Sequence, residues 1–372
     1  MIIKNANVFS KNGTFIPRDI YIDKELITDV TVDDSNIIDA EGLYAIPGLT
    51  DLHFHGCLGH DFCDGTTEAI EAIAKYQAQN GITSIAPATM SLGDDQLFNI
   101  LSRAASYKNE AGADLVGIHL EGPYLAHAKK GAQNPKYLRH ASTEHFEKLM
   151  KLAGGLIKIV SIAPEEAGAM EFIDALKDKV IISLAHTTAD YNTSMEAFEH
   201  GASHVTHLYN AMPPSSHRSP GVIGAAFDTK HSFVEVICDG IHIHPSVIRS
   251  TFQLFGDDRI VLISDSMMAT GMQDGSYSLG GQAVSVKDNL ATLSDGTIAG
   301  SATNLMKCMK NAVSYGIPLE SAIKCAAVNP AKELGIYEMY GSISTGKYAN
   351  IVLLDKGLNL KSVILKGKLL EL

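Results

Sequence analysis

The middle of this chain alternates between two kinds of segment. Eight apolar, strand-like runs are separated by segments with helical spacing, and the runs cover residues 45–55, 82–89, 115–122, 157–165, 180–187, 204–210, 233–242 and 259–267. Helical patterns at 67–74 and 245–250 follow two of the runs, the second with Pro245 at a first helical position. Strands that alternate with helices form parallel sheets, and eight such units in about 250 residues close into a barrel. The sequence therefore predicts an α/β fold with a TIM-like (β/α)8 barrel.

Both ends of the chain differ from the middle. Short strand-like segments and turns occupy residues 2–38, and similar segments recur at 349–355 and 363–365. Neither set is large enough to bury a sheet face alone, so we expect the two sets to pair. The predicted domains are a small β-domain from residues 1–44 and 341–372 and a barrel from residues 45–340. A Gly-, Ser- and Asp-rich stretch at 271–300 predicts a β-hairpin inserted after the eighth strand.

Charge and cysteine content exclude several classes of protein. The net charge is −12 over 372 residues, and Lys and Arg form no stripe of the kind that nucleic-acid binding needs. The apolar run at 1–9 is too short for a secretory signal, and no run approaches the roughly 20 residues that span a membrane. Five irregularly spaced cysteines do not make a disulfide framework. We expect a cytoplasmic globular protein that binds neither nucleic acid nor membranes.

Five potential metal ligands lie at the ends of the apolar runs. His53 and His55 end the first run, where the period of two along a strand places both imidazoles on one face. Glu121, His186 and His207 end the third, fifth and sixth runs. A carboxylate with imidazoles can bind one divalent cation and leave a position for water. A His-x-His pair alone is common, and a structural pair is its alternative reading, but convergence of several strand ends favours a metal site.

One further acid, Asp265, ends the eighth run. Beside a water whose pKa a cation has lowered, a carboxylate can accept a proton and later return it to a leaving amine. Its alternative reading is a loop-capping aspartate. His119 and His204 lie lower in their strands, where we expect core or supporting histidines. Cys57 and Cys63 lie near the histidine pair, but we interpret them as packing residues.

Five segments carry a more specific signal. They are PGLTDLHFHG (47–56), HLEGPY (119–124), THLYNAM (206–212), DGIH (239–242) and SDSM (264–267). Together they resemble the amidohydrolase superfamily, and within it the N-acetylglucosamine-6-phosphate deacetylase family, over almost the whole chain. The THLYNAM and LEGP strings are far more specific than a His-x-His pair.

The resemblance implies hydrolysis of the acetamide of N-acetylglucosamine 6-phosphate to glucosamine 6-phosphate and acetate. It implies Asp265 as the catalytic acid and base. The residues that match the principal metal ligands are Glu121, His186 and His207. Family members with an intact histidine pair, here His53 and His55, can complete a second metal site. The bridging carboxylated Lys that is frequent in the superfamily has no candidate, so Glu121 would bridge two ions. The expected cofactor is one or two divalent cations per subunit, zinc or iron.

The resemblance also implies a phosphate pocket and a homodimer. Arg218 and His242 match phosphate-binding positions, with Asn210 and the Ala211 backbone completing the pocket, and a cationic fork with an imidazole suits a phosphate. The sequence alone would make Arg218 an ordinary loop residue; in a dimer it can act across the interface. Gln133 stands where some members carry a His that contacts the substrate carbonyl, and Gln can donate a hydrogen bond there but cannot carry a proton.

Three other readings stay open. An N-acetylgalactosamine-6-phosphate deacetylase would differ at one hydroxyl and leave no readable trace in the sequence. A cyclic-amidase of the dihydroorotase type would have no need of Arg218 and His242. A non-catalytic sugar-phosphate sensor would be expected to lack the acid at Asp265, which this chain has.

Overall fold

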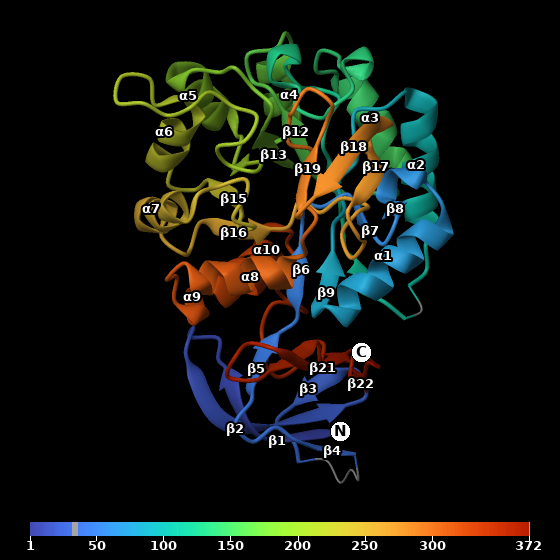
Figure 1. The fold of residues 1–372 in the computed structure, drawn as a ribbon, viewed down its shortest axis with the longest axis vertical. Coiled ribbons are helices and arrows are strands. Elements are labelled where there is room, and N and C mark those ends of the chain that lie inside the picture. Colours follow the sequence, from blue (N-terminus) through green and yellow to red (C-terminus); the bar gives the residue numbers. More distant parts are fainter. Residues whose placement is uncertain (32–35, 110, 372) are drawn as a thin grey trace.

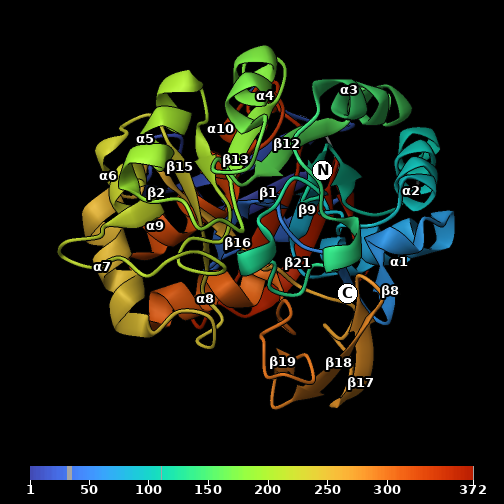
Figure 2. The ribbon, with the colours of Figure 1, turned by 90° about the horizontal axis from the view of Figure 1, so that it is seen from above.

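The computed structural model describes residues 1–31, 36–109 and 111–371. A barrel of parallel strands surrounded by helices lies next to a sheet that contains both ends of the chain (Figure 1). Viewed from above, the helices form a ring around the strands, and a small antiparallel sheet stands outside that ring (Figure 2).

Two parallel sheets make the barrel. One has the strand order β10-β9-β6 and the other runs from β11 to β16 in sequence order. Their bounds are β6 Leu49–Asp51, β9 Ile82–Ile85, β10 Asp114–Leu115, β11 Ile118–Leu120, β12 Ile157–Ile162, β13 Ile181–Leu184, β14 His204–Val205, β15 Phe233–Ile237 and β16 Ile260–Ile263. A bridge between Ala88 and His119 joins the two sheets, and Asp265 N donates to His53 O at 3.0 Å where the last strand meets the first. The predicted barrel is confirmed.

Two of the predicted runs are divided between sheets. The first part of run 45–55 lies in β5 (Tyr44–Pro47), which pairs with strands of the two chain ends, and β6 starts only after Gly48. A Cβ on Gly48 would lie 2.2 Å from Oγ1 of Thr83, so the passage between the two sheets admits only glycine. Run 115–122 is divided between β10 and β11. The prediction that each of these runs forms a single strand was wrong. Buried strands of either sheet are equally apolar, so the sequence did not show where one strand ends and the next begins.

Helices follow most of the barrel strands. They are α1 Thr67–Gln79, α2 Asp94–Ser106, α3 Thr143–Leu152, α4 Ala169–Leu176, α5 Tyr191–His200, α6 Gly221–Asp228, α7 Pro245–Phe255, α8 Leu305–Ser314, α9 Leu319–Ile323 and α10 Asn329–Glu333. The two helical patterns expected from the sequence are confirmed as α1 and α7. Helix α1 starts where Oγ1 of Thr66 accepts from Ala69 N, and it buries Ile70 and Ile73 against the strands. Among the described residues, no helix has the length and apolar character of a membrane span.

The chain ends share one sheet, as predicted. Its strands follow the order β22-β21-β20-β5-β1-β2-β3, with β4 paired to β1. The remaining bounds are β1 Ile2–Phe9, β2 Phe15–Asp23, β3 Leu26–Thr28, β4 Ile37–Asp39, β20 Ile351–Leu354, β21 Leu360–Leu365 and β22 Lys368–Leu369. The sheet has its own apolar core, in which Ile3 and Val8 from one end meet Leu353 and Ile364 from the other. Neither terminus could bury these side chains alone.

The insertion after the eighth strand is larger than the expected hairpin. It forms three antiparallel strands, β17 (Gly275–Leu279), β18 (Gln282–Lys287) and β19 (Leu290–Thr292). At its tip, Nε2 of Gln282 donates to the carbonyl oxygen of Ala132, in the loop that follows β11. This hydrogen bond attaches the insertion to the end of the barrel where the strands finish in polar residues.

Candidate metal centre

Six side chains meet at the carboxyl ends of the barrel strands. They are His53 and His55 after β6, Glu121 after β11, His186 after β13, His207 after β14 and Asp265 after β16. Each side chain belongs to a residue that is at most 8% exposed. The carboxyl ends of parallel strands open at one face of a barrel, so residues far apart in the sequence come together there.

The first group consists of Glu121, His186 and His207. Oε1 of Glu121 lies 3.1 Å from Nε2 of His186 and 3.2 Å from Nε2 of His207, and the two Nε2 atoms are 3.1 Å apart. Ligands about 2.0–2.1 Å from a tetrahedral zinc ion are roughly 3.3 Å from one another. The three atoms therefore have the spacing of ligands to one cation.

Hydrogen bonding fixes the tautomer of His186. Its Nδ1 lies 2.8 Å from the carbonyl oxygen of Lys129, and because a carbonyl only accepts, Nδ1 carries the proton. In the neutral ring, Nε2 then presents a lone pair to Glu121 and His207. Lone pairs so placed repel one another unless a cation or a proton lies between them. Two imidazole nitrogens and a carboxylate oxygen are a donor set that zinc and iron accept.

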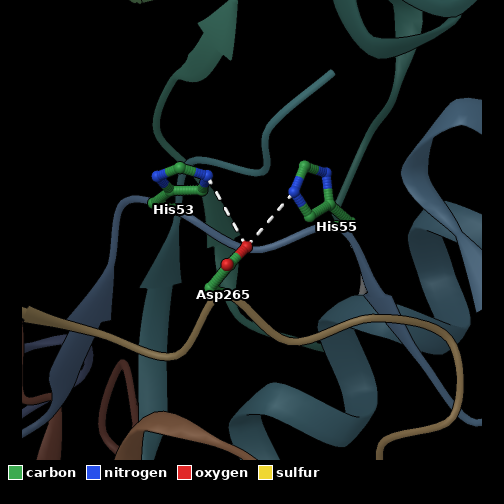
Figure 3. A group of neighbouring side chains, drawn as sticks. All are labelled: His53, His55 and Asp265. Atoms are coloured by element: carbon green, nitrogen blue, oxygen red, sulfur yellow. Dashed lines mark ion pairs between the residues drawn. The ribbon is translucent and has the colours of Figure 1, made fainter. Parts of the chain in front are cut away.

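The second group consists of His53, His55 and Asp265 (Figure 3). Oδ1 of Asp265 lies 3.3 Å from Nε2 of His55 and 3.8 Å from Nε2 of His53. Glu121 lies between the two groups, since Oε2 is 3.4 Å from Nε2 of His55 and Oε1 is 3.6 Å from Nε2 of His53. One carboxylate can thus contact cations in both groups. Neither Cys57 nor Cys63 belongs to a group of closely spaced ligand side chains among the described residues.

Several site residues have a backbone that side chains rarely adopt. The angle φ is 44° at His186, 27° at His207, 53° at Ala211 and 48° at Asp265. Positive φ at residues other than glycine costs of order 1–3 kcal/mol and persists only where surrounding structure enforces it. The sharp turns that follow the strands place these groups at the barrel mouth.

Burial and neighbouring charge act in opposite directions on the two acids. Burial opposes ionisation of Glu121, but the charge of His53 and hydrogen bonds from two other imidazoles hold its pKa well below the ordinary value. Burial likewise opposes ionisation of Asp265, but a hydrogen bond from His55 and the charge of His53 lower its pKa. Both groups are therefore carboxylates at neutral pH, as metal binding and proton acceptance require.

The two groups open into a cavity of about 350 Å³, which Gln133 also lines. Nε2 of Gln133 donates to Oε2 of Glu121 at 2.9 Å, and its Oε1 accepts from Ser91 N at 2.7 Å. The oxygen is occupied by the Ser91 amide, so Gln133 faces the site with its donor end. Leu279 and Ile298, from the insertion and the loop after it, line the same cavity.

The other predicted pocket residues include His242, Asn210 and Ala211, and all three line this cavity. Nδ1 of His242 lies 2.7 Å from Oδ2 of Asp239, which fixes the ring. Burial opposes protonation of His242, but the hydrogen bond with Asp239 raises its pKa. Nδ2 of Asn210 donates to the carbonyl oxygens of His207 and Leu208 at 3.2 Å each. The cavity thus combines candidate metal ligands with an imidazole whose charged form is favoured by Asp239.

Arg218 lies elsewhere in the chain's own fold. It is exposed and lines a separate hollow with Asp190, Tyr191 and Pro220. Its assignment to phosphate stays a prediction, and within one subunit it does not line the cavity of the metal ligands.

Sequence reasoning missed Glu235. It is fully buried on β15, and Oε2 accepts from Nδ1 of His53 at 2.8 Å. Its other oxygen lies 3.1 Å from Nε2 of His204, whose Nδ1 lies 3.0 Å from Glu333. Burial opposes the charged form of His204, but these two carboxylates raise its pKa to about 9. The sequence does place a single acid within the apolar run Phe233–Ile237, and a buried acid needs a partner, so this residue could have been recognised as a candidate.

Comparison with known proteins agrees with this geometry. Residues 44–370 match the model of the Amidohydrolase family. The chain is 38% identical over 331 residues to the N-acetylglucosamine-6-phosphate deacetylase of Bacillus subtilis (strain 168), covering 87% of this chain and 84% of the relative. It is 33% identical over 327 residues to the N-acetylgalactosamine-6-phosphate deacetylase of Escherichia coli O157:H7, covering 87% of this chain and 86% of the relative.

Among solved structures, the chain is similar to a point mutant of the N-acetyl-D-glucosamine-6-phosphate deacetylase of Mycobacterium smegmatis in complex with N-acetyl-D-glucosamine 6-phosphate. The TM-score is 0.89 with 30% sequence identity, over 99% of this chain and 98% of the other.

Proposed function

Because this chain belongs to the amidohydrolase family, we propose that it hydrolyses the acetamide of N-acetylglucosamine 6-phosphate to glucosamine 6-phosphate and acetate. The observation that carries the proposal is the shared cavity. One part of its wall presents buried carboxylates and imidazoles with the spacing of metal ligands, and another presents His242, whose charged form is favoured by Asp239. An acetamide to be cleaved and a phosphate to be bound need these two kinds of group at once.

Metal binding belongs to the proposal. Glu121, His186 and His207 would hold the principal cation, and His53 with His55 a second one. A bound divalent cation, zinc or iron, supplies a Lewis acid that polarises the acetyl carbonyl and lowers the pKa of the attacking water.

Asp265 moves the proton in this reaction. Water adds its oxygen to the carbonyl carbon of the acetyl group, and the carbon–nitrogen bond then breaks. Oδ1 of Asp265 takes a proton from the water and later gives it to the departing nitrogen, so the carboxylate is regenerated. Gln133 presents Nε2 to the same region and can donate to the carbonyl oxygen or hold Glu121 in place.

Phosphate recognition gives a first prediction. Replacing His242 with Ala should lower kcat/KM for the 6-phosphorylated sugar by about ten- to a hundredfold, since a charged hydrogen bond contributes about 1.5–3 kcal/mol. The low rate with unphosphorylated N-acetylglucosamine should change little. Steady-state kinetics on both sugars measures the difference, with His140→Ala, at an exposed histidine, as control. Equal losses on the two sugars would remove the phosphate assignment.

Arg218 and the homodimer belong together in the proposal. We propose that Arg218 reaches the phosphate in the cavity of the partner subunit. Arg218→Ala and Asp265→Asn should each give a poor enzyme. In a mixed dimer, one cavity then combines an intact Asp265 with the partner's Arg218, so mixing the two variants after subunit exchange should restore activity. A mixture no more active than the sum of its parts would refute action across the interface.

The sugar epimer is the main open choice. N-acetylgalactosamine 6-phosphate is the second candidate substrate, because one relative is an N-acetylgalactosamine-6-phosphate deacetylase. Measuring kcat/KM for both 6-phosphorylated epimers, and for dihydroorotate as a cyclic amide, decides between the candidates. Preference for the galactosamine compound would replace the proposed substrate, and preference for the cyclic amide would overturn the deacetylase assignment. Binding of either sugar phosphate without turnover by the metal-loaded protein would favour a sensor.

A further inference from the structure

Glu235 holds a central place beneath the candidate metal centre. Its carboxylate lies fully buried on β15, a strand that contributes none of the proposed metal ligands. Oε2 accepts from Nδ1 of His53 at 2.8 Å and from the backbone N of His207 at 2.9 Å. The same oxygen therefore contacts one residue from each ligand group.

The contact decides how His53 faces the cavity. A carboxylate accepts hydrogen bonds, so Nδ1 of His53 carries a proton in either charge state of the ring, and a cation bound at Nε2 would take the place of the second proton. Nε2 has no hydrogen-bond partner among the described residues. The nearest acidic oxygens, on Glu121 and Asp265, lie 3.6 and 3.8 Å from it. These distances are longer than a hydrogen bond, but they suit two atoms that bind the same cation.

We infer that Glu235 is the positioning residue for a second cation, fixing His53 with Nε2 toward His55 and Asp265 and increasing its basicity as a ligand. Carboxylate partners of metal-binding histidines act in this way, and their replacement typically costs about 10- to 100-fold in metal affinity. The inference rests on the metal chemistry of the proposed function but is independent of the sugar.

Other buried groups do not provide the same charge. His119 also faces Glu235, with Nδ1 3.7 Å from Oε1, but burial and the charge of His53 lower its pKa to about 3 and leave it neutral. His204 and Glu333 continue the chain of contacts away from the cavity. Among these groups, Glu235 is the carboxylate that hydrogen-bonds to a proposed ligand, so its charge should affect metal binding most.

Glu235→Gln is the informative substitution. The amide oxygen can keep both bonds of Oε2, and the amide nitrogen can donate to Nε2 of His204, whose Nδ1 still donates to Glu333. The fold should therefore survive while the negative charge is lost. Dialysis of the complete protein against buffers of graded free zinc, followed by elemental analysis, gives the metal content at each concentration. We expect two binding steps in the wild type, with the weaker step moved to about 10- to 100-fold higher free zinc in Glu235→Gln.

Two variants make the result specific. His55→Asn should abolish the step that belongs to the His53–His55–Asp265 group and so identify it. Glu333→Gln makes the same chemical change one residue further from the cavity and should move that step by no more than about threefold. A wild type with one step, an unchanged second step in Glu235→Gln, or equal weakening of both steps would each overturn the inference. Two steps in a protein inactive on amino-sugar phosphates would overturn only the proposed substrate.

Discussion

Replacing Asp265 with Asn is expected to lower kcat by about 10²- to 10⁴-fold, the range typical of losing a general acid or base. Asn has nearly the shape of Asp and can still contact His55 and His53, but it cannot take a proton from water and return it to an amine. The variant should keep the principal cation, which Glu121, His186 and His207 would hold, and should still bind substrate. Steady-state kinetics, elemental analysis and a direct binding measurement on one preparation separate these effects.

Asp178→Asn, the same change on the exposed surface beyond α4, is the control and should leave all three measurements unaltered. An Asp265→Asn protein that holds metal and turns over within a few-fold of the wild type would show that another group carries the proton. His55 would be the next candidate, because its Nε2 lies 3.3 Å from Oδ1 of Asp265.

The meeting of the candidate ligand side chains could be predicted from the sequence because of where strands end. His186, His207 and Asp265 each stand two residues beyond the end of a barrel strand, and the carboxyl ends of barrel strands share one face. Once eight alternating units were recognised, distant residues could be brought together without any structure. The pairing of the two chain ends followed similarly, since neither could bury its apolar side chains alone.

Features that depend on three-dimensional contacts could not be predicted. A run such as 45–55 does not reveal that β5 and β6 belong to different sheets, because both are buried and apolar. Glu235 resembles any acid in a strand until His53 and His204 are seen to contact it. The position of Arg218 outside the cavity depends on a loop path that residue type does not determine.

Glu121→Gln should remove the principal cation and lower kcat/KM by about 10³-fold or more, because a metal Lewis acid contributes several kcal/mol and each 1.4 kcal/mol is a factor of ten. Elemental analysis should find the variant depleted under conditions in which the wild type retains metal. Glu171→Gln, at an exposed position of α4, is the matched control. Full metal content with undiminished turnover would show that Glu121 is not a ligand.

The geometry also predicts how stability responds in Glu121→Gln. In the metal-free wild type, Oε1 of Glu121 lies 3.1 Å from Nε2 of His186, and hydrogen bonds from the surrounding imidazoles favour the charged carboxylate. An amide at position 121 is neutral and loses this charged interaction. The metal-free variant should thus unfold at a Tm no higher than that of the metal-free wild type. Added zinc should raise the Tm of the wild type, because a ligand that binds only the folded state stabilises it, and should raise the Tm of the variant by less. Thermal unfolding after chelation, with and without added zinc, gives the Tm of both proteins in both conditions. A wild type whose Tm does not change with zinc would contradict a metal site built around Glu121.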